Sequence, residues 1–542
     1  MRVRITGVLA VACLLLAGLT AVIGPRPAQA LEDGVARTPP MGWNTWNTFG
    51  CDISETLIRQ TVDALAGNGM GALGYKYVVV DDCWFNPSRD AQGDLQAHPT
   101  RFPSGMKALG DYIHSKGLKF GIYQVPVDKT CAQYFNAFPG ATGSRGHEVQ
   151  DARQFAAWGV DYLKYDWCSP TGTMDEQVAA FAKMRDALAA TGRPIVYSIN
   201  SNSIHDKTGP LRDWSDVAHM WRTTEDITNR WDTGSDGSSF MGVQNIINVN
   251  VPLAPYAGPG GFNDPDMLEV GNGGMTETEQ RSHFAMWAMM AAPLIAGNDV
   301  RSASAATLTI LRNAGLIAVN QDALGLQAAQ VSNDGTRRVI AKRLANGDVA
   351  VALLNQGSST ATISTTANAI GKTGASFGLR DLWTGAASTT SGTISASVPA
   401  HGTAVFRVSG GGLAPAPVPF SLRSESAGRC LDSPKGAAAN GTQQAIWECN
   451  GGAQQLITRN GNALQLLGMC LETPSGTTAG AKVRRWYCNG GANQQWNLNG
   501  NGTIGNVQTG LCLDVDGNGT ANGTPAIVWT CHGAANQRWI RG

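Results

Sequence analysis

Acidic side chains interrupt several apolar runs of this sequence, and their carboxylates are the groups best suited to chemistry. In the segment YLKYDWC, Lys164 and Asp166 place opposite charges inside a strand-like run. A buried strand tolerates charges only when they are paired or functional. Carboxylates can act as nucleophiles or as general acids and bases, so Asp166 is either half of a structural ion pair or a reacting group.

Eight strand-like runs alternate with helical patterns between about residues 40 and 325. The runs are MGWNTW, YKYVVVDDCW, KFGIYQV, VDYLKYDWC, IVYSINS, AHMWRTTED, GFNDPDML and PLIAGND. Amphipathic patterns such as ISETLIRQTVDALAGNGM and EQVAAFAKMRDALAATG lie between them. This alternation predicts an α/β fold, a (β/α)8 TIM barrel over residues 31–325. No GxGxxG motif follows a strand, which disfavours an open dinucleotide-binding sheet.

Polar or aromatic residues cluster at the ends of these runs. They are Asp81, Asp82, Tyr123, Asp166, Asn200, Asp226, Asp266, Asn298 and Asp299. In a parallel barrel the carboxyl ends of all strands face one mouth, where the chemistry takes place. We therefore expect a single acidic pocket. Caps of following helices are the alternative explanation, and we assign that role to Asp299 and Asp264.

The chain changes character after residue 325. Residues 326–408 alternate in strand fashion, as in RVIAKRLANGDVAVALLNQ and TAVFRVS, which predicts an antiparallel β-sandwich domain on the barrel. The segment GGGLAPAPVP predicts a linker at 409–419. Residues 420–542 repeat a pattern with a period of roughly forty residues, from Cys-Leu-acid to a Gln-x-Trp-like close.

The N-terminal residues 1–30 predict a secretory signal peptide. Arg2 and Arg4 precede the apolar run GVLAVACLLLAGLTAVIG, and PAQA matches a small-x-small cleavage site. An uncleaved membrane anchor is the alternative, because the run approaches spanning length. The prolines and the Ala-x-Ala pattern favour cleavage, so we expect a secreted, extracellular protein that has no membrane contact after cleavage.

The charge balance and the cysteine content limit which binding partners, disulfides and metals we expect. Lys plus Arg and Asp plus Glu both number 41, so no global field attracts nucleic acid or anionic lipid. Cys13 leaves with the signal peptide, and the other ten of the 11 Cys predict five disulfides. The sequence contains no CxxC motif and no His-rich spacing, so these cysteines do not indicate a metal site. Each C-terminal repeat is expected to hold one bridge: Cys430–Cys449, Cys470–Cys488 and Cys512–Cys531.

The three repeats resemble the ricin-B-type β-trefoil, a family 13 carbohydrate-binding module. The resemblance implies that each lobe binds sugar through the acid after its first Cys and an aromatic ring before its second. These residues are Asp432, Trp447, Glu472, Trp486, Tyr487, Asp514 and Trp529. Some rings could instead form the trefoil core. Leu456 is expected to stand where the other lobes have Trp496 and Trp539, and Glu472 replaces the usual Asp.

Residues 38–325 resemble glycoside hydrolase family 27, the α-galactosidases and α-N-acetylgalactosaminidases. The matching motifs include TPPMGWNTW, RFPSGMKALGDYIHSKGLKFGIY and MAAPLIAGNDVR, in the family's order. The resemblance implies a nucleophile at Asp166 and an acid/base at Asp226. A retaining hydrolase holds these two carboxyl groups ~5–5.5 Å apart. Lys164 and Arg222 are expected to keep Asp166 ionised, whereas Asp226 needs a raised pKa to donate its proton.

The same resemblance implies the rest of the sugar pocket. The implied substrate-binding residues are Trp46, Asp81, Asp82, Tyr123, Lys164, Asn200, Arg222, Asp266 and Met267. Asp81 and Asp82 match a pair that grips O4 and O6 of galactose. Both can reach one ligand only if the strand ends there, because adjacent strand side chains point to opposite faces. The resemblance also implies the bridges Cys51–Cys83 and Cys131–Cys168, and no metal or organic cofactor.

Departures from the family pattern leave the fine specificity open. Ile199, Asn200 and Ser201 replace a CEWG-like segment that reads the C2 substituent, and Phe262 and Trp167 are further changes. We expect a secreted, retaining exo-α-galactosidase acting on terminal α-galactose, with the trefoil binding a polysaccharide. The alternatives are a β-L-arabinopyranosidase, another family 27 specificity such as isomaltose release from dextran, and a non-catalytic lectin. Intact Asp166 and Asp226 disfavour the lectin.

Overall fold

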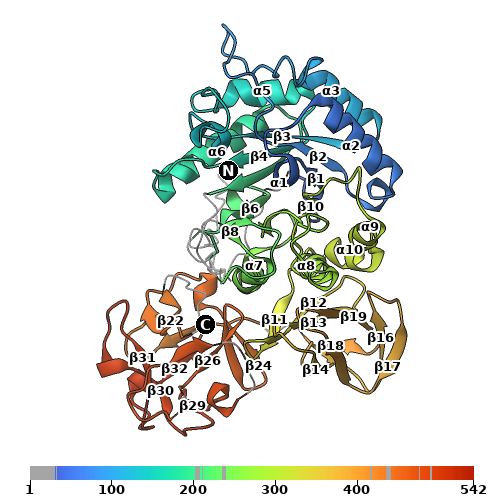
Figure 1. The fold of residues 1–542 in the computed structure, drawn as a ribbon. Coiled ribbons are helices and arrows are strands. Elements are labelled where there is room, and N and C mark those ends of the chain that lie inside the picture. The colour runs from blue at the N-terminus through green and yellow to red at the C-terminus, as the bar shows by residue number, and fades with distance from the viewer. Residues whose placement is uncertain are drawn as a thin grey trace, which may run out of the picture.

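A computed structural model describes most of the chain beyond the predicted signal peptide. The described residues are 31, 33–201, 208–209, 212–234, 240–415, 418–434, 441–474, 476–486, 488 and 491–542. The signal peptide and Tyr487 therefore lie outside them. The described chain forms a barrel, a sandwich and a trefoil, in this order (Figure 1). None of the described helices is long and apolar enough to cross a bilayer.

Eight parallel strands form the barrel, and each lies in a run that predicts it. They are β1 (Met41–Asn44), β2 (Tyr77–Val80), β3 (Lys119–Gln124), β4 (Tyr162–Asp166), β5 (Val196–Asn200), β6 (Met220–Arg222), β9 (Phe262–Asp264) and β10 (Leu294–Ala296). β10 pairs with β1, and the segment after β9 completes the ring because the Leu268 amide donates to the Ile295 carbonyl at 2.8 Å. The predicted barrel is confirmed.

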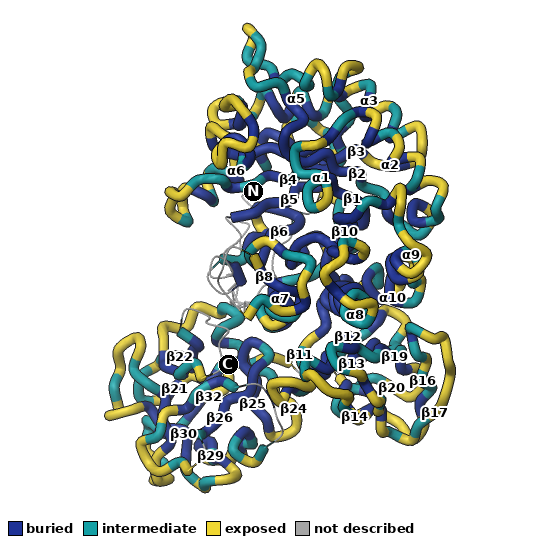
Figure 2. The backbone as a smooth tube through the Cα atoms, in the orientation of Figure 1, coloured by how far each residue is buried: buried dark blue, intermediate teal, exposed yellow. Residues whose placement is uncertain are grey.

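Helices cover the outside of this ring. They include α2 (Glu55–Gly67), α3 (Gly105–Ser115), α5 (Glu148–Trp158), α6 (Met174–Ala190), α7 (Val243–Asn250), α8 (Glu277–Met289), α9 (Ala305–Leu311) and α10 (Ala314–Asn320). α6 begins at a capping box formed by Thr173 and Glu176. Buried apolar residues of the helices and strands form one core. Figure 2 shows these buried segments inside the barrel and exposed loops around them. This core holds the strand ends, and therefore the barrel mouth, in place.

The sandwich is fixed to the barrel by a shared core. Its main antiparallel sheet contains β11 (Ala329–Asn333), β12 (Arg337–Arg343), β13 (Val349–Asn355), β19 (Thr403–Ser409), β16 (Phe377–Asp381) and β17 (Ala387–Thr390), and β14 (Ala361–Thr366) pairs with β18 (Thr393–Val398). Leu354 and Val405 belong to the same apolar cluster as Trp287 of α8. β20 (Gly412–Leu413) pairs with β15 (Lys372–Thr373), so the first part of the expected linker belongs to the sandwich.

The C-terminal repeats form three four-stranded sheets around one apolar core, as a trefoil requires. One prediction about this core is wrong. Gln455, Gln494 and Gln537 each close a short 3-10 helix, and the residue two positions further on enters the core. In the first lobe that residue is the fully buried Ile457, not Leu456. The end of the 3-10 helix determines which following residue faces the core. Leu456 directly follows this helix and lies one position before the residue that enters the core.

The trefoil also docks on the rest of the molecule. Leu467, in the turn between β25 (Ala463–Leu466) and β26 (Met469–Glu472), packs with Leu253 and Tyr256 of the barrel. Its φ of 52° lies in the left-handed region, which bulky residues adopt only when tertiary contacts compensate for the strain. The two-residue hairpin turn requires this conformation, because Leu467 and Gly468 (φ 72°) both have positive φ, as in a type I′ turn. The contact with Leu253 and Tyr256 helps to offset the cost of a bulky residue in this position.

Breaking this contact should loosen the trefoil. Leu467→Asp removes about 2 kcal/mol of apolar burial and places a charge against Leu253. We expect a larger radius of gyration in small-angle X-ray scattering. Val507 is the matched control, because it also directly follows a strand, β29 (Ile504–Asn506), but is 44% exposed. An equal increase in Val507→Asp, or none in Leu467→Asp, would contradict the docking role.

Candidate active site

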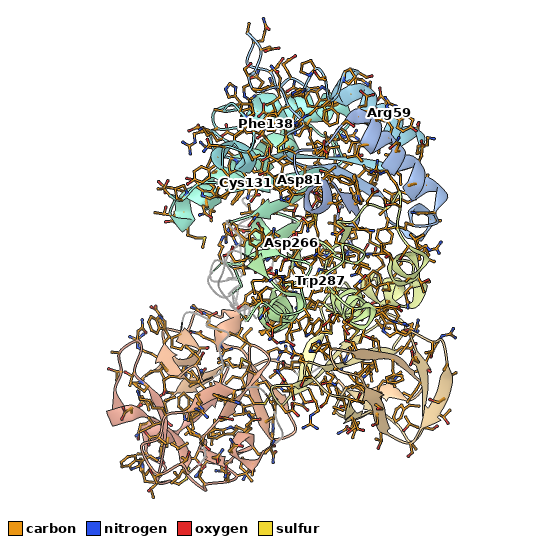
Figure 3. The ribbon with its side chains drawn as sticks, in the orientation of Figure 1. Arg59, Asp81, Cys131, Phe138, Asp266 and Trp287 are labelled. Carbon is orange, nitrogen blue, oxygen red and sulfur yellow. A yellow bond between two sulfur atoms is a disulfide. The ribbon has the colours of Figure 1, made fainter. Side chains whose placement is uncertain are left out.

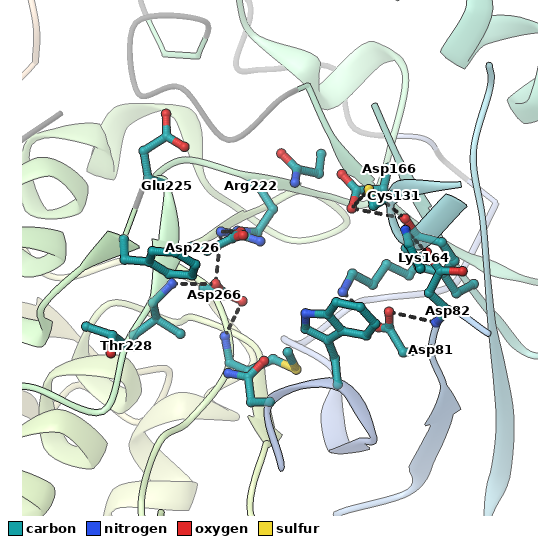
Figure 4. Close-up of a pocket in the computed structure, with 18 of the residues that line it drawn as sticks. Asp81, Asp82, Cys131, Lys164, Asp166, Arg222, Glu225, Asp226, Thr228 and Asp266 are labelled. Carbon is teal, nitrogen blue, oxygen red and sulfur yellow. Dashed lines mark hydrogen bonds and ion pairs between the residues drawn. The ribbon is translucent and has the colours of Figure 1, made fainter. Parts of the chain in front are cut away.

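The barrel mouth opens into a cavity of about 1000 Å³. Asp81, Cys131 and Asp266 lie after three different strands, β2, β3 and β9. They lie near one another in the barrel (Figure 3). Every residue that the sequence predicts for catalysis or substrate binding lines this cavity: Trp46, Asp81, Asp82, Tyr123, Lys164, Asp166, Asn200, Arg222, Asp226, Asp266 and Met267. Figure 4 shows two walls, one with Asp81, Lys164 and Asp166 and the other with Arg222, Asp226 and Asp266.

Asp81 and Asp82 both reach the cavity because β2 ends before them, at Val80. Asp81 Oδ2 accepts a hydrogen bond from Asn44 Nδ2 at 2.7 Å and pairs with Lys164 Nζ at 2.8 Å. Asp82 accepts from the backbone amide of Ala132 at 2.8 Å. Burial, reinforced by the neighbouring Asp81 charge, raises the pKa of Asp82 to about 7.

Asp166 ends β4 and points into the cavity. Its Oδ2 accepts from the Tyr123 hydroxyl at 3.3 Å and lies 3.2 Å from Cys131 Sγ. Lys164 pairs with Asp81, so the alternative of a Lys164–Asp166 ion pair is not observed among the described residues. The charge of Lys164 nevertheless lowers the pKa of Asp166, as expected. Burial outweighs the charges of Lys164 and Arg222 and raises the pKa of Asp166 to about 6. The two cations therefore oppose this rise without cancelling it.

The opposite wall is organised by Arg222, the last residue of β6. Its Nη2 pairs with Asp226 Oδ1 at 3.0 Å and with Asp266 Oδ2 at 2.9 Å. Asp266 has a φ of 78°, and its carboxylate accepts from the amides of Ile227 at 2.9 Å and Met267 at 2.8 Å. These bonds hold the backbone beside Asp226, whose side chain is 53% exposed to the cavity mouth.

Two expected helix caps are corrected. Asp264 accepts from the amide of Asp266 at 2.9 Å within a turn, where no helix begins. Asp299 pairs with Arg301 at 2.8 Å, and the next helix, α9, is capped by Ser304. Asn298 is buried but does not line the cavity. The two aspartates are therefore used by local turns rather than by helix termini.

Several cavity residues are missed by the sequence analysis. Glu269 is buried, accepts from Asn272 at 2.7 Å and from Asn47, and has a pKa raised by burial. Its place in DMLEVGN, directly after predicted pocket residues, is the signal that could have identified it. Phe135 and Phe240 also line the cavity. Nothing in their local sequence indicates this, because each lies in a connection whose path depends on the fold.

The ten cysteines form the pairs expected from the sequence. Cys51 joins Cys83, Cys131 joins Cys168, Cys430 joins Cys449, Cys470 joins Cys488 and Cys512 joins Cys531. Among the described residues, one group with metal-ligand spacing consists of Cys131, Asp166 and Cys168. Its two sulfurs are already joined to each other, and a metal is bound by free thiolates rather than by a disulfide.

The acids of the three trefoil lobes share one arrangement. Asp432, Glu472 and Asp514 are buried, and each accepts from the glutamine of its own repeat, at 2.8, 2.9 and 2.7 Å. Trp447 and Trp529 are 38% and 44% exposed. Each of the rings of Trp447, Trp486 and Trp529 lies against a glycine of another repeat, respectively Gly523, Gly441 and Gly480. The rings are therefore both packed and partly accessible.

The second lobe differs from the other two. Arg484 pairs with Glu472 at 2.8 Å, and its guanidinium lies 4.2 Å from the centroid of the Trp486 ring. A cation thus already occupies the carboxylate and the ring face that a sugar would use. In the third lobe, Asn536 donates to Asp514 at 2.8 Å and His532 Nε2 lies 3.6 Å from its carboxylate. Within the described part of the chain, no Lys or Arg lies over the Trp529 ring.

Comparison with known proteins agrees with these three parts. The sequence model of the family described as alpha galactosidase A matches residues 38–322, that of the alpha galactosidase C-terminal β-sandwich domain matches 334–408, and that of the ricin-type β-trefoil lectin domain matches 418–539. The first match alone spans more than half of the chain.

Individual relatives lead to the same family. Alpha-galactosidase A of Cellvibrio japonicus is 44% identical over 70% of this chain and 94% of its own length. Alpha-galactosidase I of Mortierella vinacea superposes with a TM-score of 0.66 at 37% identity, over 71% of this chain and 100% of its own. A β-L-arabinopyranosidase of Geobacillus stearothermophilus, solved with arabinose, has a TM-score of 0.59 at 25% identity, over 69% and 98%. The chain therefore belongs to the alpha-galactosidase family of glycoside hydrolases and carries a C-terminal ricin-type trefoil domain.

Proposed function

We propose that the chain is a secreted, retaining exo-α-galactosidase whose trefoil holds it on a polysaccharide. The observation that carries the proposal is the pair of aspartates on opposite walls of one cavity, Asp166 and Asp226, beside the sugar-binding acids Asp81 and Asp82. The signal-peptide pattern of residues 1–30 supports cleavage of this segment and export of the protein. Five disulfides are consistent with an oxidising compartment.

The reaction has two displacement steps. The Asp166 carboxylate attacks C1 and forms a glycosyl–enzyme ester while Asp226 gives its proton to the glycosidic oxygen, so the leaving group departs as a neutral alcohol. In the second step Asp226 removes a proton from water, the hydroxyl attacks C1, and Asp166 is released as carboxylate. Two inversions at C1 give net retention. Arg222 contacts Asp226 directly and balances the charge that this residue acquires.

Galactose is the favoured sugar over L-arabinopyranose. The α-galactosidases of Cellvibrio japonicus and Mortierella vinacea are 44% and 37% identical to the chain, against 25% for the arabinopyranosidase. The adjacent Asp81 and Asp82 offer carboxylate oxygens for hydroxyls on C4 and C6, and L-arabinopyranose lacks C6. Hydrolysis rates of p-nitrophenyl α-D-galactopyranoside and p-nitrophenyl β-L-arabinopyranoside compare the two directly; a faster rate on the arabinoside would refute the preference.

The two carboxylates should respond differently to substitution. Asp166→Asn removes the nucleophile but keeps the side-chain shape, so turnover should fall at least about a thousandfold with an unchanged circular dichroism spectrum and melting temperature. Asp226→Ala removes the proton donor, so melibiose, whose leaving group is poor, should lose much more activity than p-nitrophenyl galactoside. Equal losses on both substrates would contradict the role of Asp226.

The acid limb of the pH profile should report Asp166. Since the raised pKa of Asp166 is about 6, this group is protonated and unreactive at lower pH and ionised at higher pH. On this limb we expect kcat/KM to rise with pH through an apparent pKa of about 6, because kcat/KM follows the free enzyme. A profile that stays flat down to pH 4.5 would contradict this assignment.

The three trefoil lobes should contribute unequally to polysaccharide binding. Trp529→Ala should weaken retention on insoluble galactomannan or xylan roughly tenfold, as expected for loss of one aromatic contact. Trp486→Ala is the matched control and should change retention little, since Arg484 already covers that ring and its acid. Equal effects of the two substitutions would contradict the ranking.

A further inference from the structure

Two phenylalanines at the cavity mouth are unusually exposed. Phe135 is 73% exposed and Phe240 is 59% exposed, yet both line the cavity that holds Asp166 and Asp226. Other phenylalanines of the barrel, such as Phe120, Phe155 and Phe181, are fully buried. Single exposed apolar residues are common on protein surfaces, but two rings at the mouth of one reactive cavity indicate a ligand that covers them.

Phe240 lies beside the proton donor. β7 (Asp226–Ile227) and β8 (Phe240–Met241) pair in parallel, and Asp226 and Phe240 are direct partners in the register. Directly paired residues in a sheet project from the same face. The ring is therefore next to the carboxyl group that must reach the glycosidic oxygen, close to where the group attached to that oxygen must lie.

Phe135 stands on the opposite wall on a rigid support. It directly follows α4 (Cys131–Tyr134), whose first residue is bonded to Cys168 and lies against Asp166. A complete capping box of Thr130 and Gln133 fixes the helix start. The Phe135 ring packs edge-on against Tyr134, with centroids 5.0 Å apart. This aromatic surface is thus held in position before any ligand binds.

Three carboxylates of the cavity are far more buried than these rings. The carboxylates Asp81, Asp82 and Asp266 are buried, with at most 6% of each residue exposed, and they suit the hydroxyls of the sugar that is cleaved off. The exposed part of the cavity lining offers the aromatic carbon of Phe135 and Phe240 beside the Asp226 carboxyl group. An aromatic ring binds the C–H face of a pyranose or a flat aryl group by apolar burial.

We propose that Phe135 and Phe240 form the binding site for the leaving group, a pyranose or an aryl aglycone, from the two walls of the mouth. The inference rests on the proposed function and deepens it, because it assigns the part of the substrate that lies beyond the cleaved bond. Such a site makes the enzyme select for what galactose is attached to, in addition to galactose itself.

The test compares substrates with and without a leaving-group ring. For Phe135→Ala and Phe240→Ala we expect kcat/KM on melibiose to fall roughly tenfold each, while kcat/KM on α-D-galactopyranosyl fluoride stays unchanged, because fluoride has no ring and needs no proton. Phe135→Tyr should retain activity on melibiose. Leu324→Ala is the control, since Leu324 is an exposed apolar residue (39%) outside the cavity lining.

The outcomes separate this inference from the proposed function. Equal losses on melibiose and the fluoride, or no loss on either, would overturn the leaving-group site. A wild-type protein that hydrolyses neither substrate would overturn the proposed function alone. The site is then decided by calorimetry on Asp166→Asn with each alanine substitution added: weaker binding of melibiose with unchanged binding of galactose supports it, and unchanged binding of both refutes it.

Discussion

The confinement of several aspartates in one barrel mouth is the constraint on which the rest of the site depends. Like charges close together and away from water repel one another, and each must gain a cation, a hydrogen-bond donor or a proton. Lys164 serves Asp81, and Arg222 serves Asp226 and Asp266. Asp166 receives no direct cation and has a raised pKa. Burial raises the pKa of Asp82 to about 7 and that of Asp166 to about 6, and no ion pair to either carboxylate is present among the described residues. Burial and the division of two cations therefore together set how easily each acid is protonated.

Strand ends, a disulfide and a strained turn hold the carboxylates of the cavity in place. β2 ends at Val80, so two consecutive aspartates enter the same cavity. The Cys131–Cys168 bridge connects the wall that carries Phe135 to the residue two positions after Asp166. Asp266 keeps a left-handed backbone because its carboxylate binds two amides and Arg222. Strain of this kind persists only where the surrounding contacts over-determine the position.

Periodic and repeated features of the sequence predict the fold well. The eight apolar runs correspond to the eight barrel strands, and the three Cys-Leu-acid repeats correspond to the trefoil lobes. Errors arise where the register depends on a single residue. Ile457, not Leu456, enters the first-lobe core, and Gly412–Leu413 extends the sandwich into the expected linker. Alternation in the sequence does not specify which residue a 3-10 helix or a short strand includes.

The sequence by itself determines the fold class, the division of the chain and the residues that gather at the mouth. These follow from local periodicity and from the rule that parallel strands end at one face. Only the tertiary structure decides how the charges pair. Lys164 is two residues from Asp166 in the sequence yet pairs with Asp81. Phe135 and Phe240 lie in separate connections between barrel strands yet line the same cavity. Pairing and exposure depend on distances between segments far apart in the chain, which no local pattern encodes.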